Sequence, residues 1–266
     1  MKKVMSLIAA MGFMTAPLVQ AGTAITVSGS TSVTNVMEVL GETYSKNVEV
    51  QGTGSSAGIR AAKDGTSMIG MSSRDVKDTE KTDDTNVTVI ARDGIAVTTN
   101  NANKVTNLTK DEIAKIYRGE LTNWSEVGGE NRPIVVVTRD AASGTRGAFE
   151  DIMGLKRKVN EMEVSAITPR AQVGNGNGMV KTIVANNPYA IGYISLGSVD
   201  DSLSALSVDG VKPTSESIAV GEYAIARPFI VLTKSNVAPQ AIQFIDYILS
   251  DKGQQLVAEQ GYIRVQ

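Results

Sequence analysis

The stretch ITVSGSTSVTNVMEVLGETY, residues 25–44, decides the fold class of this chain. It begins with a β-branched run, Ile25 to Val27, and passes through small and hydroxyl residues at 28–32. It then carries apolar residues at helical spacing: Val33, Val36, Met37, Leu40 and Tyr44. Apolar residues three and four positions apart are typical of an amphipathic helix. The stretch therefore predicts a strand, a tight loop and a helix, which is the repeating unit of α/β proteins.

The same alternation continues to the end of the chain. Further strands are expected at 48–50, 68–71, 87–90, 95–98, 134–137, 190–194 and 229–232. Further helices are expected at 59–63, after a capping box at 109–112, and at 148–153, 179–185, 241–249 and 254–258. Alternating strands and helices predict an α/β fold with mostly parallel sheets. No long linker separates two halves, so a two-domain chain would cross between its domains more than once.

Composition excludes large classes of function. The 266 residues are 42% hydrophobic and 20% charged, as in ordinary soluble globular proteins. The chain has no Cys and no His, which excludes disulfides, thiolate zinc sites, iron–sulfur clusters and a Ser-His-Asp triad. A net charge of −2 gives no basic field for nucleic acid. The acidic residues lack EF-hand spacing, so we expect neither a metal nor a cofactor.

The first 21 residues predict a secretory signal peptide. Lys2 and Lys3 form a basic start, Met5 to Ala16 is apolar but too short to span a bilayer, and Val19-Gln20-Ala21 has the pattern of a cleavage site. No Cys follows that could carry a lipid. The sequence therefore predicts a soluble protein exported to the periplasm.

Three loops place small and hydroxyl residues between an expected strand and an expected helix: Ser28 to Ser32, Gly52 to Gly58, and Arg139 to Arg146. The first N–H groups of a helix lack partners inside it, and this end of the helix dipole is positive, so it binds anions. Arg139 and Arg146 add planar guanidinium donors that suit oxyanions. Since ligands of open α/β sheets bind at the carboxyl ends of strands, the three loops together predict an anion site.

Each loop also has a purely structural interpretation. A Ser or Thr before a helix is commonly an N-cap, and a glycine there commonly serves the turn. The glycine-rich segment 174–178 fits no dinucleotide-binding pattern, and the chain has no P-loop pattern. We expect segment 174–178 to make a turn or to bring backbone to the second face of a cleft.

Five motifs follow one another along the chain: Gly-Ser-Thr-Ser (29–32), Gly-x-Gly-Ser-Ser-Ala-Gly (52–58), Ser-Ser-Arg-Asp (72–75), Leu-Thr-Asn-Trp (121–124) and Thr-Arg-x-x-x-Ser-Gly-Thr-Arg (138–146). In this order the chain resembles the periplasmic phosphate-binding proteins of ABC phosphate importers. The resemblance implies a type II periplasmic binding protein fold, in which two α/β lobes close on the ligand about a hinge. Residues 22–98 and 226–266 would form lobe I, and residues 99–225 would form lobe II.

The resemblance also implies the partners and the ligand contacts. The protein would capture inorganic phosphate and deliver it to an ABC permease in the inner membrane; nothing suggests an oligomeric interface, so a monomer is expected. Thr31, Ser32 and Ser55 would donate from two helix N-termini, and Arg139 would supply the charged fork. The full set of expected contacts is Ser30, Thr31, Ser32, Ser55, Ser56, Ser73, Arg74, Arg139, Ser143, Gly144 and Thr145.

Ser73 departs from the family pattern. Well-known members place there an Asp that accepts the proton of hydrogen phosphate and so excludes sulfate, which has no proton to donate. In this chain Ser73 itself, Asp75 or Asp140 would have to accept that proton. Arg74 is either a second anion contact or the partner of Asp75.

Three functional hypotheses belong to different classes. The first is phosphate capture without catalysis. The second is a receptor for another oxyanion (sulfate, molybdate or a phospho-compound), or a sensor that presents its closed form to a signalling partner. The third is a phosphoesterase with a Ser nucleophile, which is disfavoured because the chain has no His and no clear carboxylate cluster for metals.

Overall fold

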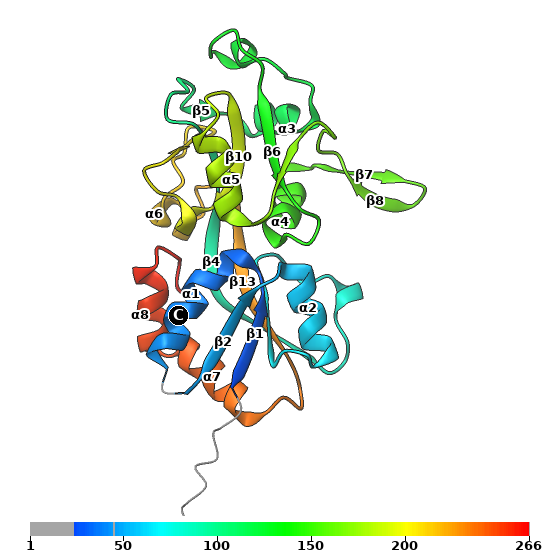
Figure 1. Cartoon of the computed structure of the whole chain (residues 1–266), viewed down its shortest axis with the longest axis vertical. Helices are drawn as coiled ribbons and strands as arrows, with labels where there is room; N and C mark the ends of the chain where they lie inside the picture. The colour runs from blue at the N-terminus through cyan, green and yellow to red at the C-terminus, as the bar shows by residue number, and fades with distance from the viewer. Residues whose placement is uncertain (1–23, 45, 266) are drawn as a thin grey trace, which may run out of the picture.

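The structure, a computed structural model, describes residues 24–44 and 46–265 and has two lobes, one above the other in Figure 1. The signal peptide predicted at 1–21 lies outside the described residues. No helix in the described ranges is both long and apolar enough to cross a membrane.

The lower lobe of Figure 1 contains both ends of the described chain. Strand β1 pairs in parallel with β2 on one side and with β3 on the other. The predicted strand-loop-helix unit at 25–44 is confirmed, since β1 leads directly into α1. The elements of this lobe are β1 Ile25–Gly29, α1 Thr31–Thr43, β2 Val48–Gly52, α2 Ser55–Asp64, β3 Ile69–Ser72, the 3₁₀ turn η1 Asp78–Glu80, α7 Pro239–Leu249 and α8 Asp251–Glu259.

The upper lobe is built from the middle of the chain. Strand β6 pairs in parallel with β10 and β9, and α3 begins at the predicted capping box of Thr109 and Glu112. The elements of this lobe are β5 Asn107–Leu108, α3 Lys110–Arg118, η2 Trp124–Val127, β6 Val135–Arg139, α4 Gly144–Met153, β7 Lys156–Val159, β8 Met162–Ser165, β9 Gln172–Gly174, α5 Gly176–Ala185, β10 Ala190–Ser195, η3 Leu196–Ser198, β11 Ser204–Ala205, β12 Ser207–Val208 and α6 Ser215–Ala219.

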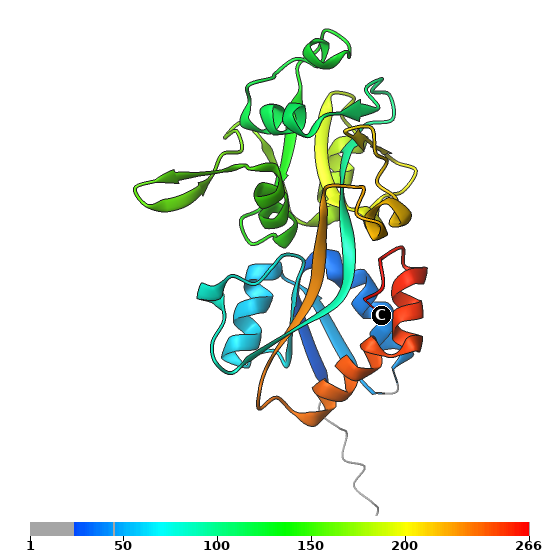
Figure 2. The ribbon, with the colours of Figure 1, turned by 180° about the vertical axis from the view of Figure 1, so that it is seen from behind.

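Two long antiparallel strands, β4 Thr85–Thr99 and β13 Ala226–Lys234, run from one lobe into the other (Figure 2). They join the two parallel halves into one sheet of order β2-β1-β3-β13-β4-β10-β6-β9. The α/β class with mostly parallel strands is thus confirmed, with antiparallel pairing where the crossing strands join. Ala91 packs in the core of the lower lobe and Ile95 in that of the upper lobe, so β4 changes lobe between them.

The two strands predicted at 87–90 and 95–98 are wrong as separate elements, because β4 is continuous through both. Asp93 and Gly94 between them are typical of a turn. In the structure Asp93 lies opposite Arg227 in the β4–β13 ladder, and the guanidinium donates two hydrogen bonds of 2.8 and 3.1 Å to its carboxylate. Because Arg227 pairs with it across the ladder, Asp93 can lie inside a strand. The residues around Asp93 in the sequence do not show this partner.

The Asp93–Arg227 ion pair is buried at the point where the chain crosses between lobes, with both side chains 1% exposed. Burial raises the pKa of Asp93, although the charge and hydrogen bonds of Arg227 act to lower it. Removing one partner leaves the other charge buried without compensation.

We therefore expect Asp93→Asn to lower the free energy of unfolding by about 2 kcal/mol, because the neutral amide keeps an acceptor but not the charge. Urea denaturation measures this loss. Adding Arg227→Gln to the same chain should recover part of it, since no lone charge then remains buried. An additive loss in the double variant would contradict the coupling.

Each lobe has its own hydrophobic core. The lower core packs α1, α7 and α8 against β1, β3 and β13 around Val36, Leu40 and Phe244. The upper core is richer in aromatic residues, with the rings of Phe149 and Tyr193 stacked at 4.0 Å and Trp124 only 1% exposed. Separate cores let each lobe keep its shape when the cleft between them changes.

The hairpin β7–β8, which projects from the upper lobe in Figure 1, was not predicted from the sequence. Its turn is made by Asn160 and Glu161, both with positive φ and neither a glycine. Sequence-based recognition of a hairpin depends mainly on Gly at such positions, so this one gave no signal.

Candidate anion-binding site

The three loops predicted to bind an anion meet between the lobes. The loops after β1 and β2 lie at the carboxyl ends of parallel strands in the lower lobe, and the loop after β6 lies at the carboxyl end of its strand in the upper lobe (Figure 1). A hydrogen bond of 3.2 Å from the Ser56 N–H to the Ala142 carbonyl joins the second loop to the third. Helices α1, α2 and α4 therefore direct their N-termini into one cleft.

Two of the predicted contact residues act as helix caps. Ser30 Oγ accepts from the Ser32 N–H at 3.2 Å, and Ser143 Oγ accepts from the Arg146 N–H at 3.2 Å. The structural interpretation of these loops is thus confirmed at Ser30 and Ser143. Helix α2 begins after Gly54 with no side-chain cap, and the hydroxyl of Ser55 in its first turn contacts Ser73.

Hydroxyl groups from the two lobes contact one another across the cleft. Ser32 Oγ lies 2.9 Å from Thr145 Oγ1, and Arg139 Nη2 donates to Thr31 Oγ1 at 3.0 Å. Both Ser32 and Thr145 are 1% exposed. The cleft is therefore closed, and its walls are lined by groups that can donate to an oxyanion.

Ser73 lies in a buried cluster of hydroxyls at the end of β3. Its Oγ accepts from Ser30 Oγ at 2.8 Å and lies 3.5 Å from Ser55 Oγ, while its N–H donates to Ser55 Oγ at 3.1 Å. Ser55 and Ser73 are fully buried. Gly144 closes over this cluster, since a Cβ there would come within 2.0 Å of Ser55 Oγ and 2.7 Å of Ser73 Oγ. The position where the family resemblance predicts an Asp is thus surrounded by hydroxyls in this chain.

Arg139 is the charged centre of the cleft. It is 2% exposed, and burial lowers the pKa of its guanidinium to about 10, so the group stays charged at neutral pH. Its Nη groups donate to neutral partners, Thr31 and Asn177, and its Nε has no partner in the described part of the chain. No ion pair joins Arg139 to a carboxylate of the described residues. A buried cation in this state is stabilised by an anion.

The charge of Arg74 is already matched. Its guanidinium makes a two-fold contact with Glu80 at 2.7 Å for each bond, and it also donates to Ser56 Oγ at 3.2 Å. Burial acts to raise the pKa of Glu80, but the hydrogen bonds from Arg74 and the Lys77 N–H and the charges of both residues together lower it. Of Asp75, Arg74 contacts only the backbone carbonyl, so the carboxylate partner is Glu80 and not Asp75.

Arg146 and Asp140 support the third loop through hydrogen bonds to its backbone. Arg146 pairs with Glu150 at 2.8 Å and donates to the carbonyl of Arg139 at 2.9 Å. Asp140 Oδ1 accepts from the Ala142 N–H at 2.9 Å, which stabilises the turn. These contacts fix the backbone from which Arg139 projects.

Asn177 is a site residue that sequence reasoning missed. It lies in the first turn of α5, is 7% exposed, and accepts from Arg139 Nη1 at 2.9 Å through Oδ1. For the glycine-rich segment 174–178 the sequence predicts a turn, or backbone that approaches the second face of the cleft, and no side-chain contact. The signal available in the sequence was a polar residue flanked by two glycines, which is too common to single out Asn177.

In the described ranges no three acidic, His or Cys side chains come together in a way that could hold a metal ion. The groups around Arg139 in the cleft are hydroxyls, backbone N–H groups and the amide of Asn177, and no carboxylate of the described residues forms an ion pair with its guanidinium. Such a set recognises an oxyanion by charge-assisted hydrogen bonds.

Known proteins are similar to this chain in sequence and architecture. A family model described as the PBP superfamily domain matches residues 16–252. The phosphate-binding protein PstS of Borreliella burgdorferi is 32% identical over 251 residues, which cover 91% of this chain and 90% of that protein.

Two solved structures are similar over the same range. One is a phosphate ABC transporter substrate-binding protein from Clostridium perfringens with bound phosphate, with a TM-score of 0.85 and 44% identity over 91% of this chain and 100% of that chain. The other is an ABC-type phosphate transport receptor from Vibrio cholerae, with a TM-score of 0.77 and 44% identity over the same shares. The chain therefore belongs to the PBP superfamily and, within it, to the PstS phosphate-binding proteins.

Proposed function

We propose that this protein captures inorganic phosphate between its lobes and delivers it to the membrane permease of an ABC importer. The observation that carries the proposal is Arg139, a buried guanidinium without a carboxylate partner where three helix N-termini meet. A phosphate anion there would receive charge-assisted hydrogen bonds in a site closed to water. The phosphate transport proteins that share the fold at 44% identity support the same function.

We propose contacts of two kinds in this site. Thr31, Ser32, Ser55, Arg139, Gly144 and Thr145 would donate directly from the cleft walls, through hydroxyl, guanidinium and N–H groups. Ser30, Ser73 and Ser143 would complete the site from the caps and the hydroxyl cluster around them. Ser56 and Arg74 would lie at its rim, since Glu80 already matches the charge of Arg74.

The lobes would act as a clamp that opens and closes about the crossing strands. We propose that the lobes divide in β4 between Ala91 and Ile95, a few residues before the boundary at 98 predicted from the sequence, and near Ala226 at the start of β13. The anion would enter the open cleft and stabilise the closed form by binding both walls. Export to the periplasm behind a cleaved signal peptide at 1–21, and a monomeric state, complete the proposal.

The relatives that cover the chain are binding proteins of transporters and not enzymes. The site supports the same conclusion for this chain, because a Ser nucleophile needs a base and the sequence has no His. Incubation with a chromogenic phosphoester should release no product above the rate in buffer.

Titration calorimetry of the exported chain, first stripped of bound anion, tests the proposal directly. We expect tight, one-to-one binding of phosphate. No heat with phosphate at any concentration that saturates relatives would refute the function, and sulfate in the same cell reports on selectivity.

The hydroxyl environment of Ser73 makes selectivity testable. An Asp at this position would accept a proton from hydrogen phosphate but repel sulfate, so we expect Ser73→Asp to raise the phosphate-to-sulfate affinity ratio about tenfold or more. Competition calorimetry with both anions measures the ratio. Ser73→Asn is the control, because Asn has nearly the same shape as Asp but carries no charge. Equal losses for both anions in the Asp variant would mean that a carboxylate here repels anions in general.

A further inference from the structure

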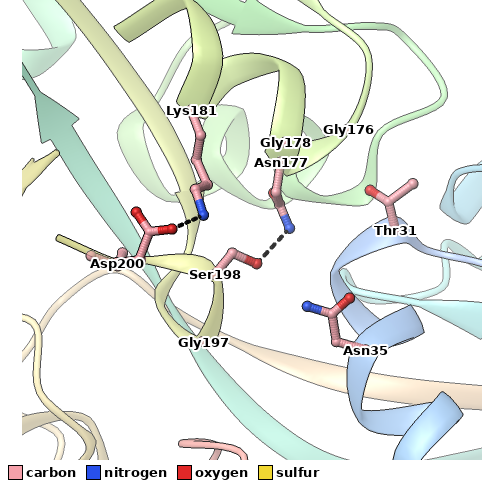
Figure 3. Close-up of a pocket in the computed structure, with 10 residues that line it drawn as sticks. Thr31, Asn35, Gly176, Asn177, Gly178, Lys181, Gly197, Ser198 and Asp200 are labelled. Carbon is pink, nitrogen blue, oxygen red and sulfur yellow. Dashed lines mark hydrogen bonds and ion pairs between the residues drawn. The ribbon is translucent and has the colours of Figure 1, made fainter. Parts of the chain in front are cut away.

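Asn177 joins both lobes and the charged centre of the cleft through one side chain. Its Oδ1 accepts from Arg139 in its own lobe, and its Nδ2 donates to Ser32 Oγ at 3.2 Å in the opposite lobe and to Ser198 Oγ at 3.1 Å. Figure 3 shows Asn177 on the wall of a polar pocket of about 430 Å³, pointing toward Ser198. The residue therefore contacts three separate elements from the first turn of α5.

The chemistry of its partners fixes the orientation of this amide. A guanidinium can only donate, so the oxygen of Asn177 has to face Arg139 and the NH₂ group has to face the two hydroxyls. The hydrogen bonds use both hydrogens of the amide. Asn177 thus holds Arg139 in place with an acceptor that carries no charge.

A neutral acceptor has a consequence for binding. An aspartate at 177 would have almost the same shape and would also accept from Arg139, but it would neutralise the guanidinium and repel an incoming anion. Of the other charges near the pocket, Lys181 on the same helix pairs with Asp200. The charge of Asp140 also acts on Arg139, but its carboxylate accepts from the Ala142 N–H. Arg227, whose charge also acts on Arg139, pairs with Asp93.

We propose that Asn177 is a positioning and specificity-determining residue that orients Arg139 while leaving its charge for the anion. This inference rests on the proposed phosphate site and adds the reason why one guanidinium in the cleft remains uncompensated. If Asn177 has this role, the affinity for the anion depends more on the charge of residue 177 than on the shape of its side chain.

Three variants separate charge from shape. Asn177→Ala removes the acceptor but adds no charge, and we expect it to weaken phosphate binding about fivefold. Asn177→Asp keeps the shape and the acceptor but adds a charge, and we expect it to bind at least about tenfold more weakly than the Ala variant. The matched control is Asn175→Asp, which puts the same charge on the exposed N-cap of the same helix, where we expect less than about a threefold change.

Calorimetry and thermal melting decide the outcome. A purely structural role predicts the opposite order, with aspartate better tolerated than alanine, and that order would overturn the inference. The unliganded Asn177→Asp protein should melt no lower than the Ala variant, because the hydroxyls of Ser32 and Ser198 can turn and donate to the carboxylate. A lower melting temperature would also overturn it. If the unmodified protein binds no phosphate, the proposed function fails instead.

Discussion

Replacing Arg139 with methionine is expected to weaken phosphate binding about 1,000-fold, because at least two charge-assisted hydrogen bonds of about 1.5–3 kcal/mol each are lost from a buried site. Methionine keeps much of the volume of the side chain, so the cleft wall stays filled. Calorimetry at high protein concentration measures the remaining affinity. Arg139→Met removes the positive charge that attracts the anion into the cleft.

The unliganded Arg139→Met protein is expected to keep its stability. Burial lowers the pKa of Arg139 to about 10 from 12.5, which corresponds to a cost of about 3 kcal/mol for holding the charged form in the empty site. The substitution removes that cost but leaves Thr31 and Asn177 without a donor, and the two effects oppose each other. The melting temperature without phosphate should therefore change little, while the increase caused by phosphate should vanish.

Arg157→Met is a suitable control, since Arg157 is an exposed arginine of the hairpin β7–β8 outside the cleft. It removes the same net charge and should leave phosphate affinity within about twofold, because exposed charges at a distance are screened by salt. Loss of affinity in both variants would point to the overall charge of the protein. Retained affinity in Arg139→Met would exclude Arg139 from the site.

The positions of the three helix N-termini in the candidate site were predicted correctly from the sequence, because each is encoded within a few residues. A strand, a Gly/Ser loop and a helix with apolar spacing specify where a helix N-terminus will lie, and 28–32, 52–58 and 139–146 all follow this pattern. Since ligands bind at the carboxyl ends of parallel strands, these positions also predict that the three loops lie together at one site.

The contacts that could not be predicted from the sequence join residues that are far apart in the chain or have several possible partners. Arg74 pairs with Glu80 and not with its neighbour Asp75, since the turn η1 brings Glu80 back toward β3. Asn177 reaches Ser32, 145 positions earlier, only because the lobes meet. Asp93 stays within a strand because Arg227 lies opposite. In each case a polar residue has several possible partners along the sequence, and packing selects one.

Gly144→Ala is expected to weaken phosphate binding about 100-fold without removing any group that contacts the anion. Gly144 is the first residue of α4, where alanine suits the helix. In the closed cleft, however, the new Cβ would lie 2.0 Å from Ser55 Oγ, 2.7 Å from Ser73 Oγ and 2.8 Å from Ser55 Cβ. These atoms belong to the opposite lobe, so the clash arises only when the lobes close. Overpacking costs about 1–3 kcal/mol, and a contact this short belongs at the upper end of that range.

Gly178→Ala is the matched control, because Gly178 also lies in the first turn of a helix at the cleft and a Cβ there meets nothing within 4 Å. Small-angle scattering and calorimetry would be measured on both variants. We expect phosphate to shrink the radius of gyration of the unmodified protein and of Gly178→Ala, but not of Gly144→Ala. Normal affinity and normal compaction in Gly144→Ala would mean that phosphate binds without the close approach of α4 to Ser55. The closed cleft would then not be the binding form, and the contacts assigned to Gly144 and Thr145 would have to be withdrawn.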